Sequence, residues 1–241
     1  MTETHQAWLA QMESESRAKQ EQFMNGIAGR LGHPRLTTAP PHPFRGAPDF
    51  WQTFGWSSDE RVQQFTDNFE AAGGHVHRLS DMQEVQSFIC SKAIELSARY
   101  MIHQNEIELN HLQLKEKLED VVVSQWNSES DEDWIARAAE ADIGIVMADY
   151  AVSHTGSIVV VSSKDKGRSV SLLPTALIAI IPLERLKTRL GEVLIDFDEA
   201  GREQLPAGIH FISGPSRSAD IENDLTIGVH GPGVVFVLIV G

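Results

Sequence analysis

The chain of 241 residues is long enough for one sizeable domain with a proper core, and its 41% hydrophobic content is ordinary for a globular protein. With 34 acidic against 20 basic residues, its formal charge of -14 argues against a nucleic-acid backbone or an anionic membrane as the main partner. The single cysteine, Cys90, excludes an internal disulfide and any cysteine-ligated iron–sulfur cluster or structural zinc site within the chain.

The N-terminal segment predicts a helical arm and a tether rather than core. Residues 6–31 are polar and helix-prone with scattered apolar positions, and the prolines between 34 and 48 are typical of an extended linker. We therefore divide the chain into an arm with its tether at 1–50 and an α/β domain at 51–241. The first residues lack the basic start of a signal peptide, and no apolar run approaches the ~20 residues that span a bilayer, so we expect a cytoplasmic protein without a membrane span.

From residue 57 onward, predicted helices and strands alternate. A capping box opens a helix at 57–60 that ends at Gly73-Gly74, and a second one at 80–83 opens a helix to about Arg99. Apolar runs predict strands, and polar periodic runs predict helices, as follows: strands at 75–79, 118–124, 142–148, 157–162 and 176–181, and helices at 131–141 and from Pro182. Short apolar strands between amphipathic helices indicate an α/β fold, with a mostly parallel or mixed sheet flanked by helices.

The segment 148–157 follows one predicted strand and leads into another. On one interpretation it is a tight hairpin-like connection with Asp149 as a turn residue. On the other, its Thr-Gly pair lies at a strand end, where His154, Thr155 and Gly156 face a ligand and His154 acts as a base. Residue types alone do not separate these alternatives.

The segment 164–174 combines a charged half with the apolar run Leu172-Leu173-Pro174. The charged half is most simply a solvated turn. Its Arg168 is nevertheless a candidate ligand-binding residue, because a guanidinium recognises a carboxylate or a phosphate in bidentate fashion. The apolar half is expected to pack and to set the direction of the next strand.

The most informative segment lies near the C-terminus, where two Gly-Pro turns bracket a polar stretch before the closing apolar strand at 234–240. We interpret the stretch after the first turn as a helix start. Ligands of open parallel sheets bind outside the carboxyl ends of the strands, and the free amides of a helix N-terminus favour an anion. The predicted ligand-binding residues here are Gly214, Ser216, Arg217, Asp220 and Gly231.

Simpler interpretations exist for two of these predictions. Arg217 and Asp220, three apart on a helix, also fit a plain surface ion pair. His230 is either a general acid or base, or a loop histidine bonded to a carbonyl. His75 and His77 alternate along a strand and face one side, but the sequence offers no metal-binding motif and no nucleotide-binding fingerprint, so we expect no metal and no cofactor.

Several of these segments resemble the lactate utilization protein C family, within the broader lactate-utilization (LUD) domain group. The resemblance covers nearly the whole chain and is most specific at the two Gly-Pro turns. It is carried by these residues: Ile27 to Gly32, Ala148 to Ala151, Thr155 to Ser157, Arg168 with Ser171 to Pro174, Gly214 to Glu222, and Gly228 to Pro232.

The resemblance implies a fold similar to the coenzyme A transferase, ribose-phosphate isomerase and formyltetrahydrofolate cyclo-ligase group. It implies a non-redox component of L-lactate oxidation to pyruvate, acting with iron–sulfur partner proteins (A-type and B-type subunits) and binding a small anion or a partner around Thr155, Arg168, Arg217 and His230. The family usually has an acidic residue where this chain has His154. A histidine can act as a base but does not form the acyl intermediate of a transferase carboxylate.

Two other functions compete with this one. One is a free-standing enzyme on a phosphorylated or coenzyme A-linked small molecule, with His154 or His230 as base. The other is a structural scaffold whose helical arm docks a partner.

Overall fold

The computed structural model describes residues 3–35, 37–38, 55–218 and 225–241, so most of the predicted proline-rich tether and the predicted site residue Asp220 lie outside the described residues. The chain divides into two compact units, Met1–Thr53 and Phe54–Gly241. The described part of the first unit is dominated by one helix, α1 (Glu3–Leu31), where the sequence predicts a helical arm.

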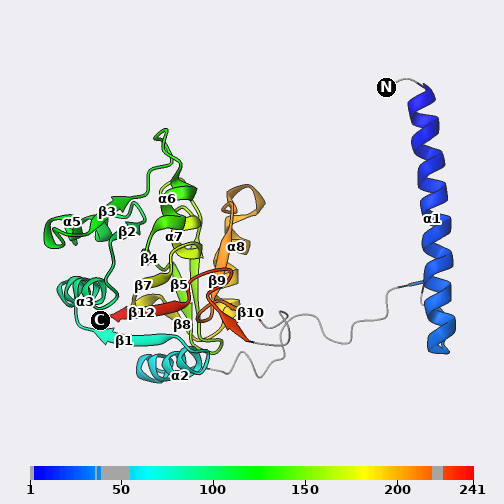
Figure 1. Cartoon of the computed structure of the whole chain (residues 1–241). Coiled ribbons are helices and arrows are strands. Elements are labelled where there is room, and N and C mark those ends of the chain that lie inside the picture. The colour runs from blue at the N-terminus through cyan, green and yellow to red at the C-terminus, as the bar shows by residue number, and fades with distance from the viewer. Residues whose placement is uncertain (1–2, 36, 39–54, 219–224) are drawn as a thin grey trace. The chain divides into compact units, whose positions relative to one another are not determined.

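A six-stranded, fully parallel sheet forms the centre of the second unit (Figure 1). Its strand order is β1-β12-β7-β4-β2-β3. The bounds are β1 (His75–Leu79), β2 (Tyr100–His103), β3 (Val122–Gln125), β4 (Ile143–Met147), β7 (Ala176–Pro182) and β12 (Val234–Val240). The α/β fold class predicted from the sequence is confirmed.

Helices cover both faces of this sheet, because alternate strand residues point to opposite sides. On β4, Ile145 and Met147 pack toward one face, whereas Val146 packs toward the other. The first face is covered by α3 (Met82–Glu95), α4 (Ile107–Asn110) and α5 (Leu114–Lys117). The second is covered by α2 (Ser58–Ala71), α6 (Trp134–Glu140) and α7 (Ser169–Leu172).

A second, four-stranded sheet of order β8-β5-β6-β9 packs on the α2 face of the main sheet. It contains β5 (Tyr150–Val152), β6 (Ser157–Val161), β8 (Leu186–Lys187) and β9 (Ile209–Ile212), and β6 pairs with both neighbours in antiparallel fashion. Helix α8 (Leu190–Ala200) contributes Val193 to a small cluster with Val152 and Val159 of this sheet. Two short strands, β10 (Arg217–Ser218) and β11 (Thr226–Ile227), form a separate antiparallel pair.

The structure corrects several predicted element bounds. The helix expected to reach Arg99 ends at Glu95, and β2 begins five residues later, a strand that the sequence did not predict. The N-cap of α3 is Asp81 rather than Ser80. The Asp81 carboxylate accepts hydrogen bonds from the backbone amides of Gln83 and Glu84. The helix expected from Pro182 is only a 3-10 turn (Leu183–Arg185) before β8, because Leu186 pairs with β5 instead of continuing a helix. Among the described residues, no helix is long and apolar enough to cross a membrane.

Candidate functional site

The turn between β5 and β6 holds three predicted site residues and is fixed to α2. Asn68 of α2 donates its side-chain amide to the carbonyls of Ser153 (2.8 Å) and His154 (3.2 Å). Gly156 has φ +56°, and a Cβ there would lie 2.8 Å from the backbone of Asn68, so this position requires glycine. The connection is therefore a hairpin, with the side chains of His154 and Thr155 exposed at its tip.

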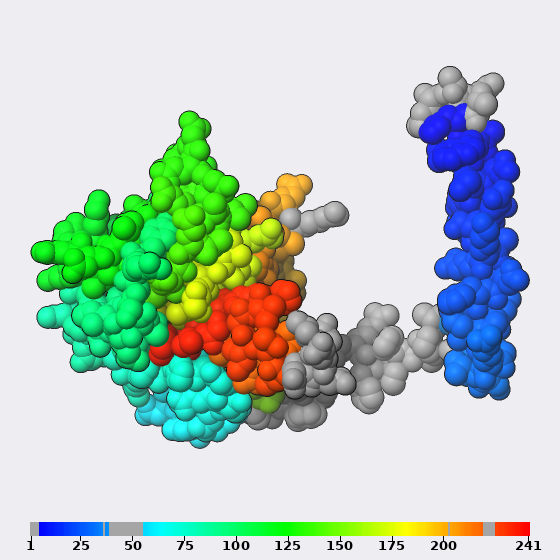
Figure 2. All heavy atoms as spheres, viewed as in Figure 1, coloured from blue at the N-terminus to red at the C-terminus, as the bar shows by residue number. Residues whose placement is uncertain are grey.

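Arg217 and Gly214 contact the C-terminal end of the same helix. The Arg217 guanidinium donates to the carbonyl of Ala72, which caps α2, and it lies so close to Gly73 that a Cβ there would be 2.7 Å from Nη2. A Cβ on Gly214, at φ +103°, would lie 2.9 Å from the Ala72 oxygen. A cation at a helix C-terminus is favoured by the helix dipole and by the free carbonyls. Figure 2 shows the C-terminal segment, orange to red, lying against α2 in cyan.

The prediction that a helix starts after the first Gly-Pro turn is wrong at Arg217. Arg217 and Ser218 form β10 and pair with Ile227 and Thr226 of β11, so they belong to an antiparallel strand pair rather than to a helix. The segment that follows the first Gly-Pro turn therefore offers no helix dipole to an anion at Arg217. The predicted partner Asp220 lies outside the described residues.

Ser216, His230 and Gly231 are brought together at a groove. The amide of Ser216 donates to the carbonyl of Pro232 (2.9 Å), and a Cβ on Gly231 would lie 3.3 Å from the Ser216 Cβ. The groove has a volume of about 580 Å³, and the described residues that line it include no lysine, arginine or carboxylate. Its lining consists of residues on either side of two turns: Leu172, Leu173, Pro174, Thr175, Ile227, Gly228, Val229, His230, Gly231 and Gly233.

Arg168 lies outside the groove, near His210. It is the N-cap residue of α7, and its positive charge acts on His210 of β9. Burial, and then the charge of Arg168, lower the pKa of His210 below its ordinary value. The His210 ring is also 2.9 Å from the hydroxyl of Ser162. The predicted residues thus fall into three places: the end of α2, the groove, and the β9 side of α7.

The groove lies at the amino edge of the parallel sheet, not at the carboxyl edge that the sequence argument assumed. Thr175 directly precedes β7, and Gly233 directly precedes β12. The assumption fails because β9, the apolar run before the first Gly-Pro turn, belongs to the second sheet and pairs in antiparallel fashion with β6.

The carboxyl edge holds a charge cluster that the sequence interpretation missed. The Lys166 ammonium lies 2.7 Å from the Asp149 carboxylate and 3.1 Å from the Glu106 carboxylate, and the Lys166 side chain is only 11% exposed. The second oxygen of Asp149 accepts the amide of Val161 (2.7 Å). Lys166 is therefore a mostly buried member of an ion triad rather than part of a solvated turn, and Asp149 does more than turn the chain.

Gln104 lies between the carboxyl ends of β2 and β4 near this cluster. Its backbone amide donates to Ile145 (3.2 Å), its side-chain oxygen accepts from Met147 (3.1 Å), and its Nε2 has no hydrogen-bond partner among the described residues. The next residue, Asn105, bonds twice to Asp165 of the loop that carries Lys166. The loop after β6 is thus fixed across the ends of β2 and β4. A sequence signal for this charge cluster exists. Asn105-Glu106 and Asp149 are polar residues that each follow a buried strand closely.

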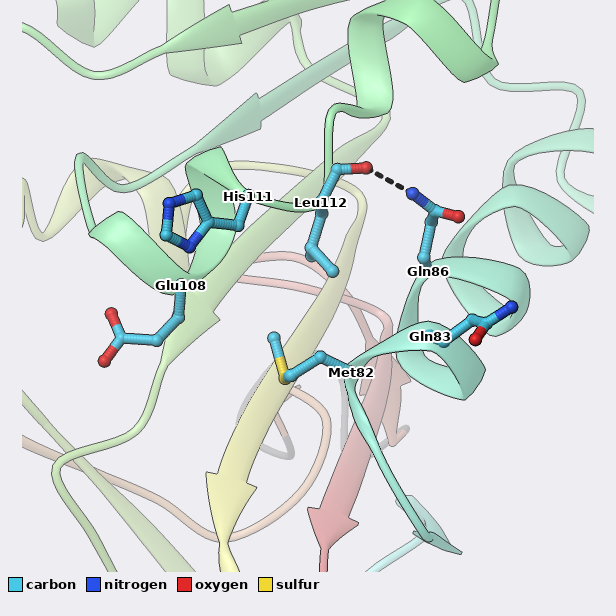
Figure 3. A pocket seen from close by; sticks show the side chains of 6 residues that line it. All are labelled: Met82, Gln83, Gln86, Glu108, His111 and Leu112. Carbon is cyan, nitrogen blue, oxygen red and sulfur yellow. Dashed lines mark hydrogen bonds between the residues drawn. The ribbon is translucent and has the colours of Figure 1, made fainter.

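In addition to the groove at the amino edge, a pocket of about 340 Å³ lies at the carboxyl edge. It is located between the first turns of α3 and the α4 segment (Figure 3). The Gln86 side chain donates to the carbonyl of Leu112 (2.6 Å) across it, and Met82 supplies an apolar wall. Glu108 and His111 complete the polar part of the lining. None of the residues predicted from the sequence lines this pocket. Among the described residues, no group of three or more His, Cys, Asp or Glu side chains could hold a metal ion.

Comparison with known proteins identifies the family. The model of the LUD domain matches residues 62–240, which is almost the whole second unit. The chain belongs to the LUD domain family. Two LUD relatives named Lactate utilization protein C are similar along nearly their whole length: that of Halalkalibacterium halodurans is 37% identical over 217 residues (89% of this chain, 94% of the relative), and that of Bacillus subtilis is 32% identical over 223 residues (88% and 92%).

A solved structure shares this LUD fold. The crystal structure of a DUF162 family protein from Deinococcus radiodurans matches with a TM-score of 0.57 at 23% identity. The match covers 78% of this chain and 100% of that chain. At this identity the likeness concerns the fold alone.

Proposed function

We propose that this LUD protein is a cytoplasmic, non-redox component of an L-lactate utilization system, in which L-lactate is oxidised to pyruvate, and that it acts with iron–sulfur partner proteins. The observation that carries the proposal is the extent of the similarity to proteins named Lactate utilization protein C. It covers 89% of this chain and 94% of the Halalkalibacterium relative, so it extends beyond the LUD domain at 62–240.

The cysteine content supports placing electron transfer on partner proteins. An iron–sulfur cluster is generally held by several cysteine thiolates, and this chain has one. That residue, Cys90, is half-buried on α3, where burial raises the pKa of its thiol. A thiol with a raised pKa is a poor metal ligand and a poor nucleophile at neutral pH.

The groove at the amino edge supports contact with a partner more than binding of a small anion. Leu173, Ile227 and Val229 are exposed apolar residues in its lining, and neither lysine nor arginine is among the lining residues in the described part of the chain. An apolar surface of this kind gains free energy by burying against another apolar surface. We propose that an apolar segment of a partner lies in the groove beside His230, Gly231 and Ser216.

Anion binding by His154, Thr155, Gly156, Arg168, Gly214 and Arg217 is the alternative use of the predicted residues. An anion at Arg217 would compete with the Ala72 carbonyl for the guanidinium. A thermal shift of the purified protein with L-lactate, pyruvate, inorganic phosphate or an acyl-coenzyme A would support this alternative, and with it the free-standing enzyme. No shift with any of them is the result that the partner proposal expects.

Co-purification tests the proposal. The tagged chain is expected to retain the iron–sulfur lactate utilization proteins of the same organism, and Val229→Asp is expected to release them because it places a charge in the apolar groove. Leu194→Asp on α8 is the matched control, since Leu194 is 40% exposed against 43% for Val229. Retention by neither the wild-type chain nor the control would refute the partnership, and equal retention by both variants would refute the groove as its site.

A further inference from the structure

Helix α1 carries its large apolar side chains on one side. Seven of them are exposed, from 39% for Ile27 to 67% for Phe23, and they recur at spacings that place them along one side of a helix of 3.6 residues per turn. The opposite side carries alanines and polar residues. The two sides therefore differ in the size of their apolar side chains, which are large on one side and small on the other. We call these seven residues the α1 stripe: Trp8, Leu9, Met12, Phe23, Met24, Ile27 and Leu31.

The α1 stripe consists of two clusters. Trp8, Leu9 and Met12 form the first, near the N-terminal end, and the four residues from Phe23 to Leu31 form the second. Between them the same side carries polar residues, including Ser16 and Gln20. A partner that covers the stripe must therefore offer two apolar clusters with a polar region between them.

The charges of α1 are distributed unevenly along its length. Between His5 and Ser16 the charged residues are Glu13 and Glu15, with no lysine or arginine. From Arg17 to Leu31 they are three cations and one acid, namely Arg17, Lys19, Arg30 and Glu21. The helix is nearly neutral, although the whole chain has a formal charge of -14. Self-association through α1 therefore avoids the strong repulsion expected between the acidic second units.

We propose that α1 pairs with α1 of a second copy of this chain in an antiparallel two-helix contact. A two-fold axis between residues 17 and 18 brings Met12 level with Phe23 of the second copy and Trp8 level with Ile27. The N-terminal cluster of each copy then packs against the second cluster of the other copy. This cluster-to-cluster contact occurs twice, as an isologous interface requires.

The charges fit the antiparallel orientation. In the antiparallel pair, Glu15 lies within about 1.5 Å of the level of Lys19 on the second copy, and both residues border the same side of the stripe. In a parallel pair, the two copies of this flank would lie on opposite sides of the contact, so the pairing of Glu15 with Lys19 would not form. Antiparallel packing also places opposite ends of the helix dipoles side by side. A bilayer surface fits less well, because interfacial helices carry many cations on the polar side, and here that side includes Glu21.

Sedimentation equilibrium of the purified full-length chain across the micromolar range tests the proposal. The wild-type chain is expected to form dimers, and Phe23→Glu is expected to weaken dimerisation at least about tenfold by placing a charge within the stripe. Asn25→Glu adds the same charge on the opposite side of α1, at an exposed position two residues away, and is expected to leave the dimer intact. A monomeric wild-type chain, or a dimer that Phe23→Glu leaves unchanged, would overturn the proposal.

Disulfide formation tests the orientation. In a Cys90→Ser background, the variants Met12→Cys and Phe23→Cys are expected to cross-link with one another when mixed. Each alone is expected to cross-link little, because the two Met12 positions lie near opposite ends of the antiparallel contact. Efficient self-cross-linking of Met12→Cys would contradict the antiparallel arrangement.

Discussion

Replacing Lys166 by methionine tests the charge cluster at the carboxyl edge of the sheet. The substitution keeps most of the side-chain volume but leaves the Asp149 and Glu106 carboxylates, 23% and 28% exposed, close together without their shared cation. Removing one partner of a fully buried ion pair costs about 3–5 kcal/mol, and the partial exposure of both carboxylates reduces that value. We expect the free energy of unfolding to fall by about 2–3 kcal/mol, which is roughly 4–12 °C in Tm for a domain of this size.

Urea denaturation followed by circular dichroism measures this loss. Lys164→Met is the matched control, because Lys164 lies two residues away, is 70% exposed and is 3.7 Å from its partner Glu129. We expect it to change the unfolding free energy by less than about 0.5 kcal/mol. Adding Asp149→Asn to Lys166→Met is expected to recover part of the loss, since one unneutralised carboxylate is removed. Equal effects of Lys166→Met and Lys164→Met would refute the reasoning.

Three further predictions concern other parts of the LUD domain. Gly156→Ala is expected to lower the unfolding free energy by about 3 kcal/mol, because a Cβ at φ +56° meets the Asn68 backbone, whereas Gly191→Ala, with open space around it, is expected to be neutral or stabilising; equal stabilities by urea denaturation would contradict this. Arg217→Ala is expected to cost about 1 kcal/mol through the lost cap of α2, and a variant as stable as the wild type in the same assay would remove that role. Burial lowers the pKa of His103, so the unfolded chain takes up a proton first, and stability is expected to fall as the pH drops through about 6.5; His103→Gln should flatten that slope, and an unchanged slope would contradict the assignment.

The sequence predicts the main elements well where local signals agree. The capping box at Ser57 and Glu60 is present, with both reciprocal hydrogen bonds, and α2 ends just before Gly73-Gly74 as expected. The apolar runs that become β4, β7 and β12 are central strands, buried on both faces, so their hydrophobicity alone identifies them. By contrast, β2 has only four residues and follows α3 closely, so its signal merges with that of the helix.

The candidate site was harder to predict because it depends on which sheet each strand joins. The apolar run at β9 looks like a parallel strand, yet it pairs with β6 in the second sheet, and this moves the Gly-Pro turns to the amino edge of the main sheet. Lys166 looks like a residue of a solvated turn, and only the tertiary structure brings it to Asp149 and Glu106. Periodicity predicts elements, whereas contacts between distant loops follow from topology.

Growth on L-lactate is the most direct test of the proposed function. A strain lacking this LUD protein is expected to fail to grow with L-lactate as the sole carbon source, to grow normally on pyruvate, and to recover when the wild-type gene is returned. Normal growth of the deletion strain on L-lactate, with no second copy of the gene present, would contradict the account.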